Sequence, residues 1–233
     1  MPAPSGPSLL PAQNREPTSA AIFLHGYGSN GDDLIGLAPF FARGLPATAF
    51  YSPHAPQPWE GGFFGGRQWF SLAGYDPEAL RRDPARAGGM LQRMLEGAQA
   101  AARFLDDYID AVVAHHQLAS DKVALIGFSQ GTMMALYAGL RREQALAGIV
   151  GFSGAMLGGD ALKNDVKSRP PVLLVHGDAD PVVPVESLGA IKTALTAAQV
   201  PFDAHVIAGL QHGIDDKGAT LAAMFLQKHL TKS

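Results

Sequence analysis

Six short apolar runs, separated by longer segments with helical periodicity, most strongly constrain the fold of this chain. The runs are predicted to be strands at Ala20–Leu24, Thr48–Tyr51, Val123–Ile126, Ala147–Phe152, Val172–Val175 and Ala204–Ile207. Alanine-rich amphipathic segments are predicted to be helices at Arg86–His115, Thr132–Arg141, Val185–Ala198 and Ala219–Leu230. Apolar strands that are separated by helices pair in parallel and are joined by right-handed crossovers. The predicted fold class is α/β, with a mostly parallel, doubly wound sheet flanked by helices on both faces.

Two other segments modify this pattern. The 233 residues show no second composition regime, so a single domain over residues 1–233 is predicted. Residues 1–17 are rich in proline, which confines a short antiparallel hairpin through Ser8-Leu9-Leu10 to an edge of the sheet. Residues 52–83 are rich in glycine and aromatic side chains. A loop of this length is usually functional or disordered, and its aromatic content argues against disorder. It is therefore predicted to form a partly mobile wall of the active site.

Composition excludes several classes of partner. The net charge is -3 and the 18 basic residues form no concentrated run, which argues against nucleic acid and anionic membranes. The chain has no cysteine, so neither a disulfide framework nor a thiolate metal site is expected, and a reducing compartment suits it. The apolar runs are too short to span a bilayer, and the proline-containing start does not resemble a secretory signal. A cytoplasmic location is the resulting prediction.

A glycine-flanked serine follows the third predicted strand and precedes a predicted helix. The sequence Gly-Phe-Ser-Gln-Gly at Gly127–Gly131 therefore has the arrangement of a nucleophile elbow, with Ser129 at the tight turn. Small residues on both sides allow the strand and the helix to approach closely around a strained serine. The alternative is an ordinary strand-to-helix turn, since this five-residue pattern is common by chance. Three further segments favour the elbow.

A serine hydroxyl needs a base to remove its proton and a carboxylate to orient that base. The loop after Val172–Val175 contains Asp178 and Asp180, and the loop after Ala204–Ile207 contains His212 between glycines. The order Ser, Asp, His along the chain is that of an α/β-hydrolase. Asp180 is favoured as the acid, and Asp178 is assigned to the turn, where it caps local backbone amides.

The other seven histidines are given structural positions. His205 is interpreted as a strand residue, and His54 as a polar residue of a proline-rich loop. His25 and His176 each precede a glycine at a strand end, where an imidazole usually bonds to loop backbone. The remaining three are interpreted as solvated helix ends, namely His115, His116 and His229.

Acyl transfer also requires donors for the oxyanion of the tetrahedral intermediate. The backbone N–H of Gln130, which follows the candidate nucleophile, is one such donor. The segment Ile22–Gly28 is a buried strand that runs into a His-Gly turn, and it could direct the N–H of Tyr27 to the same point. The alternative for His25-Gly26 is a simple tight turn.

Four segments together resemble the carboxylesterase, lysophospholipase and acyl-protein thioesterase branch of the α/β-hydrolases. They are LHGYGSNGDDL at Leu24–Leu34, GFSQG at Gly127–Gly131, HGDADPVVP at His176–Pro184 and GLQHGI at Gly209–Ile214. The resemblance implies an α/β-hydrolase fold, with Ser129 as nucleophile, Asp180 as acid, His212 as base and the amides of Tyr27 and Gln130 as the oxyanion hole.

The segment GGRQWFSL at Gly65–Leu72 also resembles the loop that borders the acyl pocket in this family, with Trp69 at its aromatic position. Two positions differ from the family's pattern. Ser71 stands where many relatives carry aspartate, and His54 stands where asparagine is common. These differences concern substrate preference rather than the three candidate catalytic residues.

The implied activity is hydrolysis of carboxylic esters with short to medium acyl chains, through an acyl-enzyme and without a metal or organic cofactor. The expected partner is a small-molecule ester, and a homodimer is also considered. Apolar residues predicted to contact the substrate are Phe63, Phe64, Trp69, Met156, Leu157, Val182, Val183 and Leu210. A lysophospholipase or an acyl-protein thioesterase would use the same residues. A dienelactone-type hydrolase is disfavoured because such enzymes usually carry a cysteine nucleophile, and the remaining alternative is a catalytically silent binding module.

Overall fold

One seven-stranded sheet organises the computed structural model, which describes residues 5–12, 15–62, 65–74 and 84–231. The strand order is β1-β3-β2-β6-β7-β8-β9. Every neighbouring pair is parallel except β1 and β3, which are antiparallel. The strands are β1 (Ser8–Leu9), β2 (Ser19–Leu24), β3 (Thr48–Tyr51), β6 (Val123–Phe128), β7 (Gly148–Phe152), β8 (Val172–Gly177) and β9 (Phe202–Ile207). The predicted fold class and all six predicted strands are confirmed.

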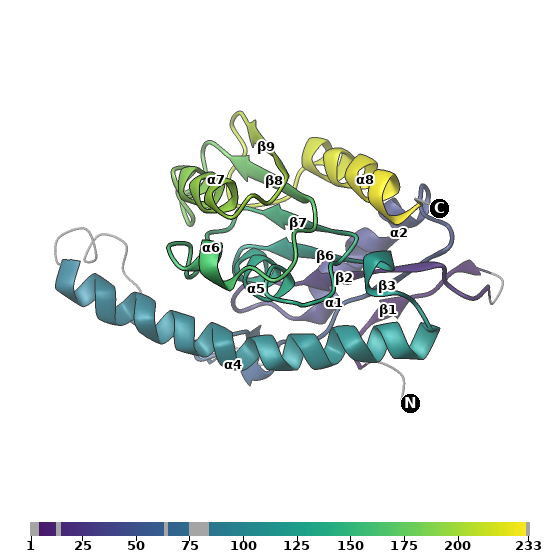
Figure 1. Ribbon diagram of the computed structural model, residues 1–233, viewed down its shortest axis with the longest axis horizontal. Helices are drawn as coiled ribbons and strands as arrows, with labels where there is room; N and C mark the ends of the chain where they lie inside the picture. The colour runs from purple at the N-terminus through teal and green to yellow at the C-terminus, as the bar shows by residue number, and fades with distance from the viewer. Residues whose placement is uncertain (1–4, 13–14, 63–64, 75–83, 232–233) are drawn as a thin grey trace.

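Helices cover both faces of this sheet. One face packs against α4 (Pro84–His116), α5 (Gln130–Gly139) and α7 (Ser187–Ala197), and the other against α1 (Gly31–Leu34), α2 (Ala38–Ala42) and α8 (Asp216–Leu230). Figure 1 shows the long α4 and the C-terminal α8 on opposite sides of the strands. All residues of α5 are buried because this helix lies between the sheet and α4. Of the helices that the structure describes, none is long and apolar enough to cross a membrane.

Alternation along the central strands creates two apolar cores. In β2, Ile22 and Leu24 join the core beneath α4 and α5, whereas Ala21 and Phe23 join the core beneath α2 and α8. Successive side chains of a strand point to opposite faces, so a strand that is apolar throughout serves both cores. This explains why the central strands are continuous apolar runs in the sequence.

The N-terminal segment differs from its prediction. β1 is short, antiparallel and at the edge of the sheet, but it does not form a hairpin with the strand that follows it. Its partner is β3, with Ser8 opposite Tyr51 and Leu9 opposite Phe50. Because β3 also pairs with β2, it lies between β1 and β2, two strands that are consecutive in the chain.

Several short elements were not predicted. The segment after β2 forms α1, a 3-10 turn η2 (Ile35–Leu37) and α2 in succession. Within the predicted long loop, β4 (Gln57–Pro58) and β5 (Arg67–Gln68) pair as a small antiparallel sheet. The others are η3 (Ser120–Lys122) and α6 (Leu162–Asp165).

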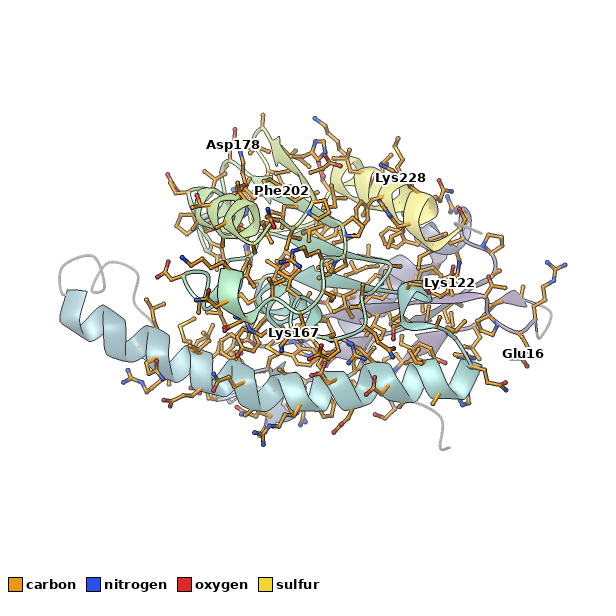
Figure 2. All side chains as sticks on the ribbon, viewed as in Figure 1. Glu16, Lys122, Lys167, Asp178, Phe202 and Lys228 are labelled. Atoms are coloured by element: carbon orange, nitrogen blue, oxygen red, sulfur yellow. The ribbon has the colours of Figure 1, made fainter. Side chains whose placement is uncertain are left out.

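The parallel strands bring their carboxyl ends to one end of the sheet. Figure 2 shows Asp178, which follows β8, far from Lys122, which precedes β6. The turn after β6 and the loops after β2, β8 and β9 therefore meet at the same end. In open α/β sheets, ligands bind in the crevice outside these carboxyl ends.

Candidate active site

Ser129 occupies a strained turn between β6 and α5. Its backbone has φ 54° and ψ -115°, a conformation that L-residues rarely adopt. The surroundings explain how the turn is tolerated. A Cβ on Gly131 would lie 1.8 Å from the carbonyl oxygen of Leu24, and one on Gly127 would lie 2.5 Å from the carbonyl oxygen of Gly131. Both positions therefore require glycine, and the predicted strand, turn and helix are observed.

Asp180 and His212 form a hydrogen-bonded pair beside this turn. The Nδ1–H of His212 donates to Oδ2 of Asp180 at 2.8 Å. The other carboxylate oxygen accepts from the amides of Val182 and Val183, each at 2.9 Å. Burial disfavours the ionised carboxylate, but the bonds from His212 and the two amides outweigh it and hold the pKa of Asp180 below its usual value. Asp180 is thus an anion that fixes the tautomer of His212.

Asp178 lies outside this pair. Its side chain is exposed, and its Oδ1 accepts from the amide of Gly209 at 2.6 Å. It caps backbone, as predicted, although the amide belongs to the loop after β9 rather than to its own turn. The structure therefore brings Asp180, and not Asp178, to His212.

His212 and Ser129 line the same cavity, although no hydrogen bond joins their side chains in the described structure. The ring of His212 packs against that of Phe128, with 4.8 Å between the centroids. Because Nδ1 is committed to Asp180, Nε2 is the nitrogen that remains for a proton from the serine. Such hydrogen bonds are often long in unliganded enzymes and tighten when substrate binds.

Two residues that line this cavity have unpaired backbone amides. Tyr27 and Gln130 both line it, and within the described residues neither backbone N–H has a hydrogen-bond acceptor. Gln130 is also the first residue of α5, whose N-terminus carries partial positive charge. Unpaired amides at a buried site are rare. They are therefore candidate donors for a negatively charged oxygen.

The loop that carries Tyr27 is held by a buried histidine. His25 donates from Nδ1 to the carbonyl of Gly26 at 2.8 Å and accepts at Nε2 from the amide of Ala55 at 3.0 Å. Its own carbonyl accepts from the indole N–H of Trp69 at 3.0 Å. Burial lowers the pKa of His25 to about 4, which keeps the ring neutral near pH 7. The predicted backbone-bonding position of His25 is confirmed.

The side chain of Gln130 forms hydrogen bonds to a distant loop that were not predicted from the sequence. Its Oε1 accepts from the amide of Trp69 at 2.9 Å, and its Nε2 donates to the carbonyl of Phe70 at 2.8 Å. This side chain is almost completely buried. It therefore joins the start of α5 to the segment that resembles the loop bordering the acyl pocket.

Glu60 was also missed. Its carboxylate accepts from the hydroxyl of Tyr27, the hydroxyl of Ser71 at 2.6 Å and the amide of Leu72 at 2.9 Å. Burial disfavours the charged form, but the bonds from Ser71, Tyr27, Leu72 and Gln68 outweigh it and lower the pKa of Glu60. Burial, together with Glu60, raises the pKa of Tyr27 to about 12. One carboxylate thus joins the loop that carries Tyr27 to Leu72 in the cavity wall.

The cavity beside Ser129 has a volume of about 310 Å³. Of the predicted substrate contacts, Val182 and Val183 line it. Apolar residues that line it without having been predicted are Leu72, Met94, Phe128, Met133 and Ala155. Met94 and Met133 lay on predicted apolar helix faces, but the sequence does not show which part of a face adjoins a cavity.

The other predicted contacts lie elsewhere. Trp69 is fully buried beneath the cavity loops, and Leu210 packs against the core on the α8 side of the sheet. Met156 and Leu157 line a separate cavity of about 730 Å³ between α4 and α7. Phe63 and Phe64 fall outside the described residues.

Other histidines form structural contacts. His176 is buried and bonds to the carbonyl of Val183 at 2.9 Å, as expected for a ring at a strand end. His54 Nδ1 accepts from the amide of Gly31 at 3.1 Å. His116, predicted to be solvated, is instead partly buried and bonds to the hydroxyl of Tyr51 at 2.6 Å. Across the described part of the chain, no group of three or more His, Cys, Asp or Glu side chains is arranged to hold a metal ion.

The fold and the site together define an α/β-hydrolase. The sheet is mostly parallel, a strained serine follows β6, and an Asp–His pair comes from the loops after β8 and β9. A sequence profile of the phospholipase/carboxylesterase family matches residues 10–230. The chain therefore belongs to this family, which confirms the resemblance seen in the sequence.

Individual relatives agree with this assignment. Acyl-protein thioesterase 1 of Neurospora crassa is 30% identical over 188 residues, which cover 76% of this chain and 72% of that protein. The crystal structure of esterase PE8 is 38% identical, with a TM-score of 0.86 over 97% of this chain and 99% of the other. Acyl-protein thioesterase 2 of Zea mays shares the fold, with 22% identity, 97% and 100% coverage and a TM-score of 0.71.

Proposed function

We propose that this hydrolase is a serine carboxylesterase for carboxylic esters of short to medium acyl chain, with Ser129 as nucleophile, His212 as base and Asp180 as acid. One observation carries the proposal. Ser129, His212, Tyr27 and Gln130 all line the same cavity, and the backbone amides of Tyr27 and Gln130 have no acceptor among the described residues. A nucleophile, its base and two oxyanion donors are the set of groups that acyl transfer requires.

In the first half of the reaction, Oγ of Ser129 attacks the ester carbonyl while Nε2 of His212 takes its proton. The carbonyl oxygen becomes an anion that accepts hydrogen bonds from the amides of Tyr27 and Gln130. The ionised Asp180 stabilises the imidazolium that forms on His212. When the intermediate collapses, the bond to the alcohol oxygen breaks, and His212 returns its proton to that oxygen.

In the second half, water takes the place of the alcohol. His212 removes a proton from the water, whose oxygen attacks the acyl-enzyme, and the same two amides stabilise the second oxyanion. Collapse breaks the bond to Oγ of Ser129, which recovers its proton from His212. The carboxylic acid then leaves.

Acyl-chain preference follows from the walls of the cavity. Leu72, Met94, Met133, Val182 and Val183 offer an apolar surface beside Ser129. Each methylene buried there contributes roughly 0.8 kcal/mol, so kcat/KM rises with chain length until the cavity is filled. The volume of about 310 Å³ favours short to medium chains.

A second candidate is hydrolysis of thioesters or lysophospholipids by the same residues. It is supported by the curated relatives, since those of Neurospora crassa and Gibberella zeae are named acyl-protein thioesterases. Rates with an oxygen ester and a thioester of the same acyl group would separate the two candidates. A cytoplasmic location, a homodimer and the absence of a nucleic-acid partner remain predictions from the sequence.

The proposal is tested with a series of p-nitrophenyl esters from short to long acyl chains. We expect Ser129→Ala to lower kcat/KM by at least about 1,000-fold. The variant should fold, because the smaller side chain leaves the turn and its packing unchanged. An unchanged melting temperature serves as the control for folding. Equal rates in the wild type and the variant would overturn the assignment.

A further inference from the structure

A second cavity adjoins the first at His212. It has a volume of about 350 Å³ and is lined by Asp33, Leu34, Leu37, Phe128, His212 and Ile214, with the backbone of Gly36 and Gly213. Asp33, Phe128 and His212 line both cavities. The two cavities thus meet at the ring that the proposed mechanism uses as its base.

The chemistry assigns different parts of the substrate to these cavities. His212 gives its proton to the alcohol oxygen as the acyl–oxygen bond breaks, so the alcohol must lie on the His212 side of the carbonyl carbon. The acyl chain extends to the opposite side, along the apolar wall that contains Met94 and Met133. The second cavity, which His212 also lines, is therefore placed to receive the alcohol.

Asp33 gives this second cavity its charge. Its side chain is exposed and accepts a hydrogen bond from the hydroxyl of Ser29 at 2.7 Å. Among the salt bridges of the described residues, none involves Asp33. The negative charge of Asp33 also acts on His25, so its field reaches the loop that carries Tyr27.

The remaining lining suits an alkylated cation. Leu34, Leu37 and Ile214 are apolar, and the ring of Phe128 presents an aromatic surface between the two cavities. Aromatic rings together with a carboxylate are the groups that bind alkylammonium ions in proteins. A neutral alcohol would use the apolar surface but would gain nothing from the charge.

We infer that the cavity lined by Asp33, Phe128 and Ile214 binds the alcohol part of the substrate and favours alcohols that carry an alkylammonium group. This inference rests on the proposed function, because it takes His212 to be the group that protonates the alcohol. Asp33 is then a specificity-determining residue of the ester hydrolase.

The test compares two esters of one acid that differ in charge alone. Butyrylcholine carries a trimethylammonium group, and 3,3-dimethylbutyl butyrate carries the neutral group of the same shape. We expect the wild type to show a ratio of kcat/KM, cationic over neutral, of about 3 to 10, because a charge pair near a protein surface is only partly screened. Raising the salt concentration should lower this ratio.

Variants of two adjacent aspartates make the test specific. Asp33→Asn keeps an oxygen that can accept from Ser29, and it should reduce the ratio to about 1 and remove its salt dependence. Asp33→Glu should retain a ratio above 1. Asp32→Asn removes an exposed neighbouring charge that lines neither cavity, and it should change the ratio by less than about twofold.

The outcomes separate the two proposals. Hydrolysis of p-nitrophenyl butyrate with a ratio near 1 in the wild type would overturn the inference alone. An equal fall in the ratio for Asp32→Asn and Asp33→Asn would also overturn it, since a diffuse charge effect would then suffice. If the wild type cleaves none of these three butyrates and no thioester, the proposed function fails and the inference fails with it.

Discussion

Asp178 and Asp180 lie two residues apart and have different surroundings. Asp180 is buried and accepts from His212 and from two amides, whereas Asp178 is exposed and caps Gly209. A buried carboxylate that accepts three hydrogen bonds has a strong preference for the charged form. Of the two aspartates, only Asp180 is therefore placed to hold the imidazole of His212 in the proposed proton transfer.

We expect Asp180→Asn to lower kcat by about 10³- to 10⁴-fold, because an amide can stabilise the wrong tautomer of His212 and carries no charge. Asp178→Asn is the matched control. Its oxygen still accepts from the amide of Gly209, and the change in kcat should be less than about threefold. Steady-state kinetics on one p-nitrophenyl ester measure both variants. Comparable losses in the two would argue against the assignment of Asp180 as the acid.

Sequence reasoning selected Ser129, Asp180 and His212 because each lies next to a strand end with a local signal of glycines or turn residues. The structure brings these three residues to one place. Glu60 had no such signal, since its partner Tyr27 is 33 residues away in the chain. Trp69 and Leu210 were also predicted to contact substrate. Trp69 is fully buried and Leu210 packs partly against the core, and neither lines the cavity beside Ser129. The direction in which a loop side chain points depends on tertiary packing, which composition does not encode.

At the scale of elements, the wall of the cavity at Leu72 belongs to the segment that follows the small sheet of β4 and β5, and this segment has two anchors. Gln130 joins α5 to the segment after β5, and Glu60 joins the turn between β4 and β5 to Tyr27, Ser71 and Leu72. The hydroxyl of Ser71 is one of the donors to Glu60. The wall therefore depends on one carboxylate that accepts from several donors.

We expect Glu60→Gln to raise KM for the longest accepted acyl chain by about 3- to 10-fold, with a smaller effect on the shortest chain. The amide has one acceptor oxygen where the carboxylate has two, so Tyr27, Ser71 and Leu72 cannot all keep their partner. Glu143→Gln, at an exposed site in a different region, is the control. KM and kcat across the ester series measure the effect. An unchanged chain-length profile would show that Glu60 does not position the wall.

The elements that were missed share a physical cause. α1, η2 and α2 are each no longer than five residues, and helical periodicity cannot be recognised over so few positions. The first of them depends on Asn30, whose side chain accepts from the amide of Asp32. β1 pairs with β3 across some forty residues of chain, and a long-range pairing of this kind has no local signature.

The whole sheet was predictable because its signals are local and repeated. Apolar strands alternate with amphipathic helices, and right-handed crossovers then leave few topologies. The order β3-β2-β6-β7-β8-β9 places the loops after β2, β6, β8 and β9 at one end. The candidate site is thus a consequence of the topology, whereas its exact lining depends on packing between helices.

Stability of the whole molecule should depend on pH through His25. This buried ring has a pKa of about 4, compared with 6.5 for a solvated histidine, so the unfolded chain binds more protons between these values. Stability is therefore greatest above pH 6.5 and falls as the pH decreases toward 4. Urea unfolding at pH 7 and pH 4.5 should show a loss of about 2 to 3 kcal/mol from this group.

The control variants isolate that contribution. His25→Gln should be less stable at pH 7 but should show a smaller loss of stability on acidification, because it has no proton to gain. His205→Gln, exposed on β9, should keep the loss seen in the wild type. The same dependence on pH in wild type and His25→Gln would assign the acid sensitivity to other groups.

The steric limits at Gly127 and Gly131 do not depend on whether Ser129 is catalytic. Neighbouring backbone occupies the space that a methyl group would need at either glycine, so both are fixed by packing alone. Under the proposed function, Ser129 is required only for its hydroxyl. A descendant that lost ester hydrolysis would therefore drift at position 129 while keeping both glycines. In genomes, a preserved glycine frame around a substituted serine would mark such inactive descendants of this lineage.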